Sequence, residues 1–437
     1  MDYDSKVRSP ASSVAHRKVL AMRRFALTCL IASLLSSSLG AQEWTRFRGP
    51  NGSGVSEAKN VPGKWTDADY NWTTKLPGVG HSSPVVWGDR IFLLSADPES
   101  ATRYVLCVSV EDGKVVWQRE YPGEPHHLHV RSSYASCTPA VDEKQIYVAW
   151  SDPDHTLLRA FDHEGNETWT VDLGPWVSQH GFGTSPVVYK DMVIIGCSQE
   201  PTKRADMLQP KESFVVAVDK TNGKIRWRTN RVVDTTSYSV PCVRKNEKGK
   251  DELVFLSTAE GFFALDPQTG RENWSLKAFK MRTVSSPILV GDLIFGTTGS
   301  GGGGNTVVAM HPGEDPEIVY EIKKEAPYVP TPVSAGDDRL ILWSDKGIVT
   351  CIEAASGNRV WQKRVGGVGY SSSPIRVDDK VYCVDEAGMV VVIAASDTFE
   401  ELGRMNLEGE CRSTPAVADG RMYLRTVSHL YSIGGKQ

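Results

Sequence analysis

Nine side chains that could bind an anion lie shortly before eight regularly spaced prolines. The prolines are 41 to 55 residues apart: Pro84, Pro139, Pro186, Pro241, Pro287, Pro332, Pro374 and Pro415. The nine side chains are cationic, imidazole or phenolic: His81, Arg131, Tyr134, His180, Tyr238, Arg282, Tyr328, Tyr370 and Arg412. Arginine forks bind carboxylates through paired hydrogen bonds, and aromatic rings stack on flat ligands. If the nine converge, they could hold a planar anion; alternatively, Arg and His pair with acidic neighbours and the tyrosines cap inner strands.

Catalytic and metal-binding patterns are sparse. The sequence has no G-x-S-x-G nucleophile turn, and His81 and Ser82 are neighbours in sequence only, so no catalytic set is assigned. In the run His126-His127-Leu128-His129, the side chains of His127 and His129 would lie on one face of a strand and could bind a metal ion. No nearby carboxylate or cysteine completes a ligand set. A solvated loop is the other interpretation, and the metal stays unassigned.

The repeat predicts the elements that position these side chains. Each proline opens a short apolar run, followed by a Gly/Asp turn and a second apolar run, as at Gly291-Asp292. A third run ends in a turn with glycine, and a tryptophan often follows four residues later. We expect six tryptophans to have a structural docking role: Trp72, Trp117, Trp169, Trp227, Trp274 and Trp361. Four strands per unit without a helical period indicate a β-propeller rather than a helical solenoid.

The two ends of the chain indicate how the ring closes. The last unit has strands near Pro415–Val417, Met422–Thr426 and His429–Ile433, and then the chain stops. Near the other end, Tyr70–Thr74 has the pattern of an outer strand without the three that should precede it. We therefore predict an all-β, eight-bladed propeller of four-stranded antiparallel blades, the last closed by the N-terminal strand.

One repeat resembles a known family. Ala264–Trp274 resembles the docking repeat A-x-D-x-x-T-G-x-x-x-W of the pyrroloquinoline-quinone-like (PQQ-like) propellers, and Ala217–Trp227 is a looser copy. The resemblance covers about residues 65–437 and implies the propeller fold. The family includes BamB-like scaffolds and quinoprotein alcohol dehydrogenases. Trp44–Gly54 looks like the opening W-x-x-F-R-G-P-x-G-x-G of exported relatives, and we expect Trp44 and Phe47 to tuck onto the ring.

The N-terminal region has the pattern of an export signal. Residues 22–41 combine a basic start, a short apolar stretch and the small-residue exit Leu39-Gly40-Ala41. We expect a cleavable signal peptide at 1–41, with Met22 as an alternative start, a lead segment at 42–64 and the propeller at 65–437. The product would be periplasmic or secreted, without a transmembrane segment. A formal net charge of −4 does not suit nucleic acid or an anionic membrane.

These observations leave two functions open. The first is an exported, non-catalytic, monomeric scaffold of the cell envelope that binds envelope or secreted proteins and needs no cofactor. The second, implied by the resemblance, is a PQQ-dependent alcohol dehydrogenase with calcium, in which Arg282, Arg412 and the tyrosines surround the quinone. Seven cysteines follow the signal peptide and no two are adjacent. The vicinal disulfide of such dehydrogenases is therefore absent.

Overall fold

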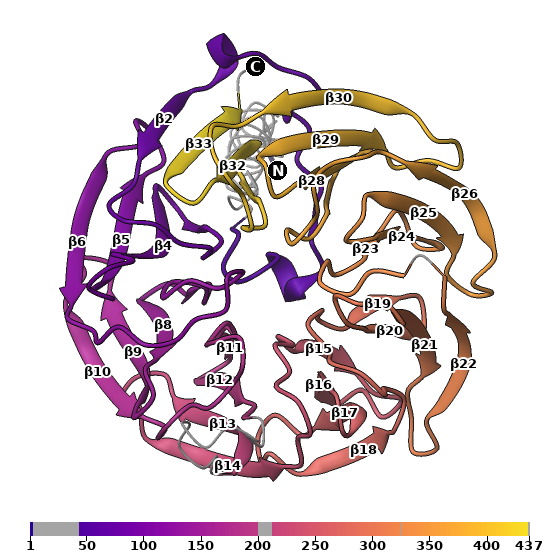
Figure 1. Ribbon diagram of the computed structural model, residues 1–437, viewed down its shortest axis with the longest axis horizontal. Coiled ribbons are helices and arrows are strands. Elements are labelled where there is room, and N and C mark those ends of the chain that lie inside the picture. The colour runs from indigo at the N-terminus through magenta and orange to yellow at the C-terminus, as the bar shows by residue number, and fades with distance from the viewer. Residues whose placement is uncertain (3–42, 200–211, 325, 436–437) are drawn as a thin grey trace. The chain divides into compact units, whose positions relative to one another are not determined.

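The computed structural model describes residues 1–2, 43–199, 212–324 and 326–435, so almost all of the predicted signal peptide, Met22 included, lies outside the described residues. The chain divides into Met1–Gln42 and Glu43–Gln437. The second unit contains eight sheets arranged in a ring, with the outermost strands at the circumference (Figure 1). The helices of the described part are too short or too polar to cross a membrane.

The strands follow one another blade by blade, innermost strand first. Blade 1 has β3 (Val85–Trp87), β4 (Arg90–Ala96), β5 (Arg103–Ser109) and β6 (Val115–Tyr121). Blade 2 has β7 (Ala140–Val141), β8 (Gln145–Ser151), β9 (Thr156–Asp162) and β10 (Glu167–Asp172). Blade 3 has β11 (Val187–Tyr189), β12 (Met192–Cys197), β13 (Ser213–Asp219) and β14 (Ile225–Arg231). Blade 4 has β15 (Cys242–Lys245), β16 (Asp251–Ser257), β17 (Gly261–Leu265) and β18 (Glu272–Leu276).

The second half continues in the same order. Blade 5 has β19 (Ile288–Val290), β20 (Leu293–Thr298), β21 (Thr306–His311) and β22 (Glu317–Ile322). Blade 6 has β23 (Val333–Ser334), β24 (Arg339–Trp343), β25 (Ile348–Glu353) and β26 (Arg359–Arg364). Blade 7 has β27 (Ile375–Val377), β28 (Lys380–Val384), β29 (Met389–Ala394) and β30 (Glu401–Asn406). Blade 8 has β31 (Ala416–Ala418), β32 (Arg421–Arg425) and β33 (His429–Gly434). The N-terminal elements are η1 (Pro50–Gly52), β1 (Val55–Ser56), η2 (Asp67–Asp69) and β2 (Trp72–Lys75).

Burial explains why these runs form blades. The second and third strands of each blade are covered on both faces by neighbouring blades, and they are nearly continuous apolar runs, as in β4. The outermost strands alternate exposed and inward residues, as in β10. Blade 8 takes its fourth strand from the N-terminal side, because β2 pairs antiparallel with β33. The predicted eight blades and their closure by the N-terminal strand are confirmed.

A tryptophan on the outermost strand of one blade packs against the turn glycine of the next. At Gly113, a Cβ would lie 2.5 Å from the Trp72 ring, so the close contact requires glycine. The Trp72 Nε1–H donates to the Val110 carbonyl at 3.0 Å. Trp117, Trp169, Trp227 and Trp361 donate to the next blade in the same way, and the Tyr320 hydroxyl does so where the repeat lacks a tryptophan.

Trp274 is the exception among the six predicted docking residues. Its Nε1–H donates at 3.1 Å to the Glu252 carboxylate of its own blade. The corresponding turn of blade 5 runs through Pro312 and Gly313, and a Cβ on Gly313 would meet Glu247 rather than an indole ring. The side chain of Trp274 still lies in an apolar cluster with Ile294 and Met310 of blade 5.

A ring of hydroxyl groups connects the blades near the central axis. Seven of the eight prolines directly follow a Ser or Thr. The hydroxyl oxygen of each of these seven residues accepts a hydrogen bond from the backbone N–H of the residue at the same position in the preceding blade. The donor and acceptor pairs are Ser83 to Thr138, Thr138 to Ser185, Val240 to Ser286, Ser286 to Thr331, Thr331 to Ser373, Ser373 to Thr414, and Thr414 to Ser83, at 2.9 to 3.1 Å. The series is interrupted between blades 3 and 4, because Val240 has no hydroxyl group. We refer to these seven Ser and Thr residues as the hydroxyl ring.

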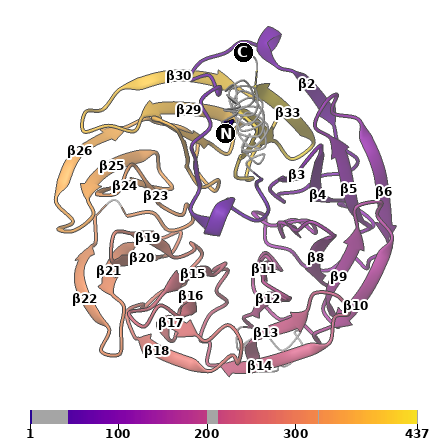
Figure 2. The same ribbon diagram turned by 180° about the vertical axis from the view of Figure 1, so that it is seen from behind.

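The lead segment crosses the centre of the ring, as the indigo trace with η1 shows from both sides (Figures 1 and 2). Trp44 pairs with Val86 of blade 1, and β1 adds to the inner edge of blade 7. Arg46 donates to the Pro241 carbonyl of blade 4 at 2.6 Å. The fully buried Arg48 donates to the carbonyls of Thr331, Pro332 and Pro374, and to Gly52 and Ser53 within the segment.

These contacts satisfy carbonyl groups that the short innermost strands leave without partners. Burial lowers the pKa of Arg48 to about 9 and that of Arg46 to about 10, so both remain charged at neutral pH. The lead segment therefore closes the centre of the ring and ties together blades that are far apart in sequence.

The interblade contact at Gly270 should contribute measurably to stability. A Cβ there would lie 2.4 Å from the Trp227 ring, whereas at Gly249, with nearly the same φ of 72°, it would meet nothing within 4 Å. We expect Gly270→Ala to lower the free energy of unfolding by about 1–3 kcal/mol more than Gly249→Ala does. Urea unfolding midpoints of both variants would test this. Equal losses of unfolding free energy would show that the contact with the Trp227 ring does not contribute to stability.

The hydroxyl ring gives a second stability prediction. Ser373→Ala removes the acceptor of the buried Thr331 N–H and should cost about 1–3 kcal/mol of unfolding free energy. Ser373→Thr is the control, because threonine already occupies the equivalent position in three blades, as at Thr138. Urea unfolding of both variants measures the difference. A Ser373→Ala protein as stable as the threonine variant would show that the link contributes little.

Candidate functional site

Seven of the nine predicted side chains line one cavity of about 820 Å³, which we call the funnel. They come from the loops that precede the prolines of seven different blades: His81, Arg131, His180, Tyr238, Arg282, Tyr328 and Arg412. The loops meet because each leads into an innermost strand, and all innermost strands surround the central axis. The volume is typical of a pocket for a small ligand.

The charge of the funnel is opposite to that of the chain. Its described lining includes Arg131, Lys280, Arg282 and Arg412 but no Asp or Glu side chain. The whole chain has a formal net charge of −4. Such a concentration of positive charge in a concave site attracts anions and raises their local concentration.

Two imidazoles lie together at the funnel, from loops of neighbouring blades. The rings of His129 and His180 meet edge to face with centroids 4.2 Å apart. Burial, together with the positive charges of Arg282 and Arg131, lowers the pKa of His180 to about 4. Burial and the same two arginines also lower the pKa of His129. At neutral pH both rings are uncharged and act as hydrogen-bonding groups, while the arginines carry the charge.

Arg412 follows the alternative interpretation, in which a cation pairs with an acidic neighbour. Its Nη1 lies 2.9 Å from Oε1 of Glu386, on the adjacent blade 7, and the Ser371 hydroxyl donates to the same oxygen. Burial, with Arg412 and Arg425 nearby, lowers the pKa of His81 to about 3. This side of the funnel is therefore partly neutralised, and Arg412 is held in place.

The two tyrosines of the funnel are also held by neighbours. The carboxylate of Asp345 accepts the backbone N–H groups of Tyr328 and Val329 at 2.7 and 3.1 Å, which fixes that loop. Burial raises the pKa of the Tyr328 hydroxyl, beside Arg282, so it stays protonated and can donate. The Tyr238 hydroxyl lies 3.1 Å from the Ser178 hydroxyl.

The structure places Tyr134 and Tyr370 outside the funnel lining. Tyr134 lies under Arg103, and its hydroxyl bonds to the backbone of His126. Tyr370 is almost completely buried and packs against Trp343. In both cases the loop turns the ring toward a partner inside the protein, away from the shared space.

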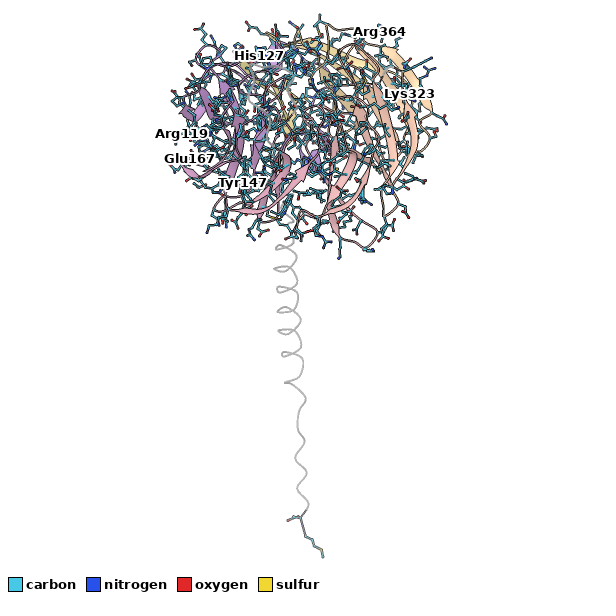
Figure 3. The ribbon with its side chains drawn as sticks, turned by 60° about the horizontal axis from the view of Figure 1, so that its bottom comes forward. Arg119, His127, Tyr147, Glu167, Lys323 and Arg364 are labelled. Carbon is cyan, nitrogen blue, oxygen red and sulfur yellow. The ribbon has the colours of Figure 1, made fainter. Side chains whose placement is uncertain are left out.

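The histidine run does not come together as a ligand set. His127 is exposed at the upper edge of the ring in Figure 3, whereas His129 faces His180. In the described part of the chain, no group of three or more His, Cys, Asp or Glu side chains is arranged to hold a metal.

Sequence reasoning did not identify several lining groups. The hydroxyl ring contributes Ser83, Thr138, Ser185, Thr331, Ser373 and Thr414 to the wall, and Lys280 and Phe47 also line the funnel. The Ser or Thr before seven of the eight prolines was the visible signal for the hydroxyl groups. Phe47 was expected on the ring, but its place in the funnel depends on how the lead segment crosses the centre.

The described residues do not fit a calcium-bound quinone. Calcium takes six to eight oxygen ligands, usually with carboxylates among them, and the described funnel lining has no carboxylate. The seven described cysteines are buried, unpaired thiols, and burial raises the pKa of each. No catalytic step is derived through that cofactor.

Comparisons with known proteins agree with the fold. A family model described as outer membrane protein assembly factor BamB matches residues 65–312, 322–400 and 345–433. The structure of BamB from Moraxella catarrhalis is similar, with a TM-score of 0.60 and 15% identity over 83% of this chain and 98% of that one. Quinohemoprotein alcohol dehydrogenase from Comamonas testosteroni gives a TM-score of 0.63 and 14% identity over 91% of this chain and 81% of that one.

A curated relative is also similar in sequence. Tetrathionate hydrolase from Acidithiobacillus ferrooxidans is 22% identical over 238 residues, which are 51% of this chain. The matched part spans 42% of the length of that relative.

The electrostatics of the funnel can be measured through His180. Its pKa should be about 4 by NMR titration, and Arg282→Gln should raise it, because the substitution removes a nearby positive charge. The exposed His155, whose pKa is raised mainly by its hydrogen bond with Asp172, is an internal control that should not change. An unchanged His180 pKa in the variant would mean that Arg282 does not act on this imidazole.

Proposed function

This chain belongs to the family of PQQ-like propellers described as outer membrane protein assembly factor BamB, and we propose that it is a cell-envelope protein whose funnel binds a small anion. The export signal pattern at residues 22–41 supports the location. The proposal requires binding alone and assigns no catalytic residue.

The observation that carries the proposal is the cationic lining, whose described residues include no Asp or Glu. Arg131, Lys280 and Arg282 lie in one concave space, although the chain as a whole is acidic. Surface arginines usually lie among carboxylates that partly neutralise them. Cations gathered in one concave space repel one another, and an anionic ligand would reduce that repulsion.

Uncharged groups in the funnel complement these charges. The Tyr328 hydroxyl and the hydroxyl ring can donate to oxygen atoms of a ligand, and the neutral imidazoles of His129 and His180 can donate or accept. The name of the curated relative, tetrathionate hydrolase, refers to a doubly charged anion, which is consistent with an anion-binding funnel.

A second candidate is the scaffold expected from the family. Two outermost strands carry adjacent exposed apolar residues, Val115 and Val116 on β6 and Ile318 and Val319 on β22. Outer strands are sheet edges to which a partner segment can add by backbone hydrogen bonds. This function would use the circumference of the ring rather than the funnel.

Calorimetric titration with sulfate, tetrathionate and pyrroloquinoline quinone would test the funnel proposal. We expect saturable binding of at least one of them by the full chain, weakening as salt is added. The double variant Arg131→Gln/Arg282→Gln should weaken binding at least tenfold, because each charged hydrogen bond contributes about 1.5–3 kcal/mol.

The control is Arg271→Gln, which removes one positive charge from an exposed turn away from the funnel. It should leave the affinity nearly unchanged. Absence of binding by all three anions would overturn the proposal and leave the scaffold as the function to pursue.

A further inference from the structure

The funnel changes from charged to apolar along its depth. In the loop before Pro287, Arg282 and Val284 line the cavity. The residue that follows each of them, Thr283 and Ser285, is buried. Alternate residues of an extended segment lie on the same side, so Val284 is one step deeper than Arg282. In the neighbouring loop, Tyr328 and the next residue toward the proline, Val329, both line the funnel.

The base of the funnel is an aromatic and aliphatic surface. Phe47 is partly exposed and lines the funnel, while Arg46 and Arg48 on either side are buried and bind proline carbonyls of the innermost strands. The ring of Phe47 therefore lies at the level of the prolines, below the loops that carry the cations. It packs with Val240 in one apolar cluster.

Val240 is the position at which the hydroxyl ring is interrupted. The other seven residues before the prolines are Ser or Thr, so Val240, beside Phe47, is the one apolar residue among these eight positions. Four apolar side chains of the lining, Val284, Val329, Val240 and Phe47, are called the strip here, and Arg282 lies two residues before Val284.

Resting on the proposed anion-binding function, we propose that the ligand is an elongated amphipathic anion. Its carboxylate or sulfonate head lies at Arg131 and Arg282, and its apolar tail extends along the strip to Phe47. A cavity of about 820 Å³ accommodates such a tail. A compact, fully hydrated anion would leave the apolar base in contact with water.

The test is a titration of the full chain with straight-chain alkanesulfonates from ethanesulfonate to octanesulfonate, below their micelle concentrations, with sulfate as the tail-free reference. Affinity should rise about fourfold per methylene, since each buried methylene contributes roughly 0.8 kcal/mol, until the tail reaches Phe47. Two variants alter the base. Phe47→Ala removes the ring, and Val240→Thr adds a hydroxyl group with little change of shape.

Both base variants should reduce the affinity for octanesulfonate at least fivefold and leave sulfate binding unchanged. The pair Arg131→Gln/Arg282→Gln should weaken every member of the series. If sulfate binds but affinity does not depend on chain length, the anion site stands and the amphipathic ligand is wrong. The same conclusion follows if octanesulfonate still binds the double arginine variant. Loss of binding for sulfate and the whole series in the unsubstituted chain would overturn the proposed function itself.

Discussion

The ring depends on one repeated hydrogen bond, in which a backbone N–H donates to the hydroxyl of the residue before the next blade's proline. Proline fixes its own φ and restricts the residue before it to extended conformations, so each hydroxyl is presented at a defined position. Seven such links, at 2.9 to 3.1 Å, connect the starts of neighbouring innermost strands around the axis. The loops directly upstream inherit that arrangement, which explains how side chains from seven blades come to line one cavity.

The lead segment completes this arrangement from the other side of the prolines. Innermost strands of two to four residues leave carbonyl groups directed at the centre, and Arg48 donates to three of them from blades 6 and 7. A buried guanidinium without a carboxylate is stable here because five carbonyl oxygens in all accept from it. The same segment places Phe47 in the funnel lining. One stretch of chain therefore both closes the centre of the ring and forms the base of the site.

Much of the fold followed from the sequence, because its determinants are local. Prolines, turn glycines and apolar runs specify strands and hairpins within a few residues, and their period indicated eight blades. The missing fourth strand of the last unit similarly predicted the pairing of β2 with β33.

Side-chain direction within the funnel loops was less accessible. Tyr134 and Tyr370 occupy the same kind of position as Tyr238 and Tyr328, yet their rings pack under Arg103 and against Trp343. Those partners are 27 to 31 residues away in sequence and become neighbours only in the assembled ring. Trp274 has the docking pattern in full, but a carboxylate on β16, Glu252, accepts its indole N–H instead. A repeat motif thus predicts position reliably and contact less so.

The fold alone does not select a function, because a quinohemoprotein dehydrogenase and BamB both share this architecture. Their sequence identities to this chain are only 14% and 15%. What distinguishes this chain is the composition of its loops. Arg412 has its acidic neighbour, Glu386, whereas the described lining around Arg131 and Arg282 contains no carboxylate. Two arginines in one concave space, with no Asp or Glu side chain in the described lining, are the observation on which the proposed anion binding rests.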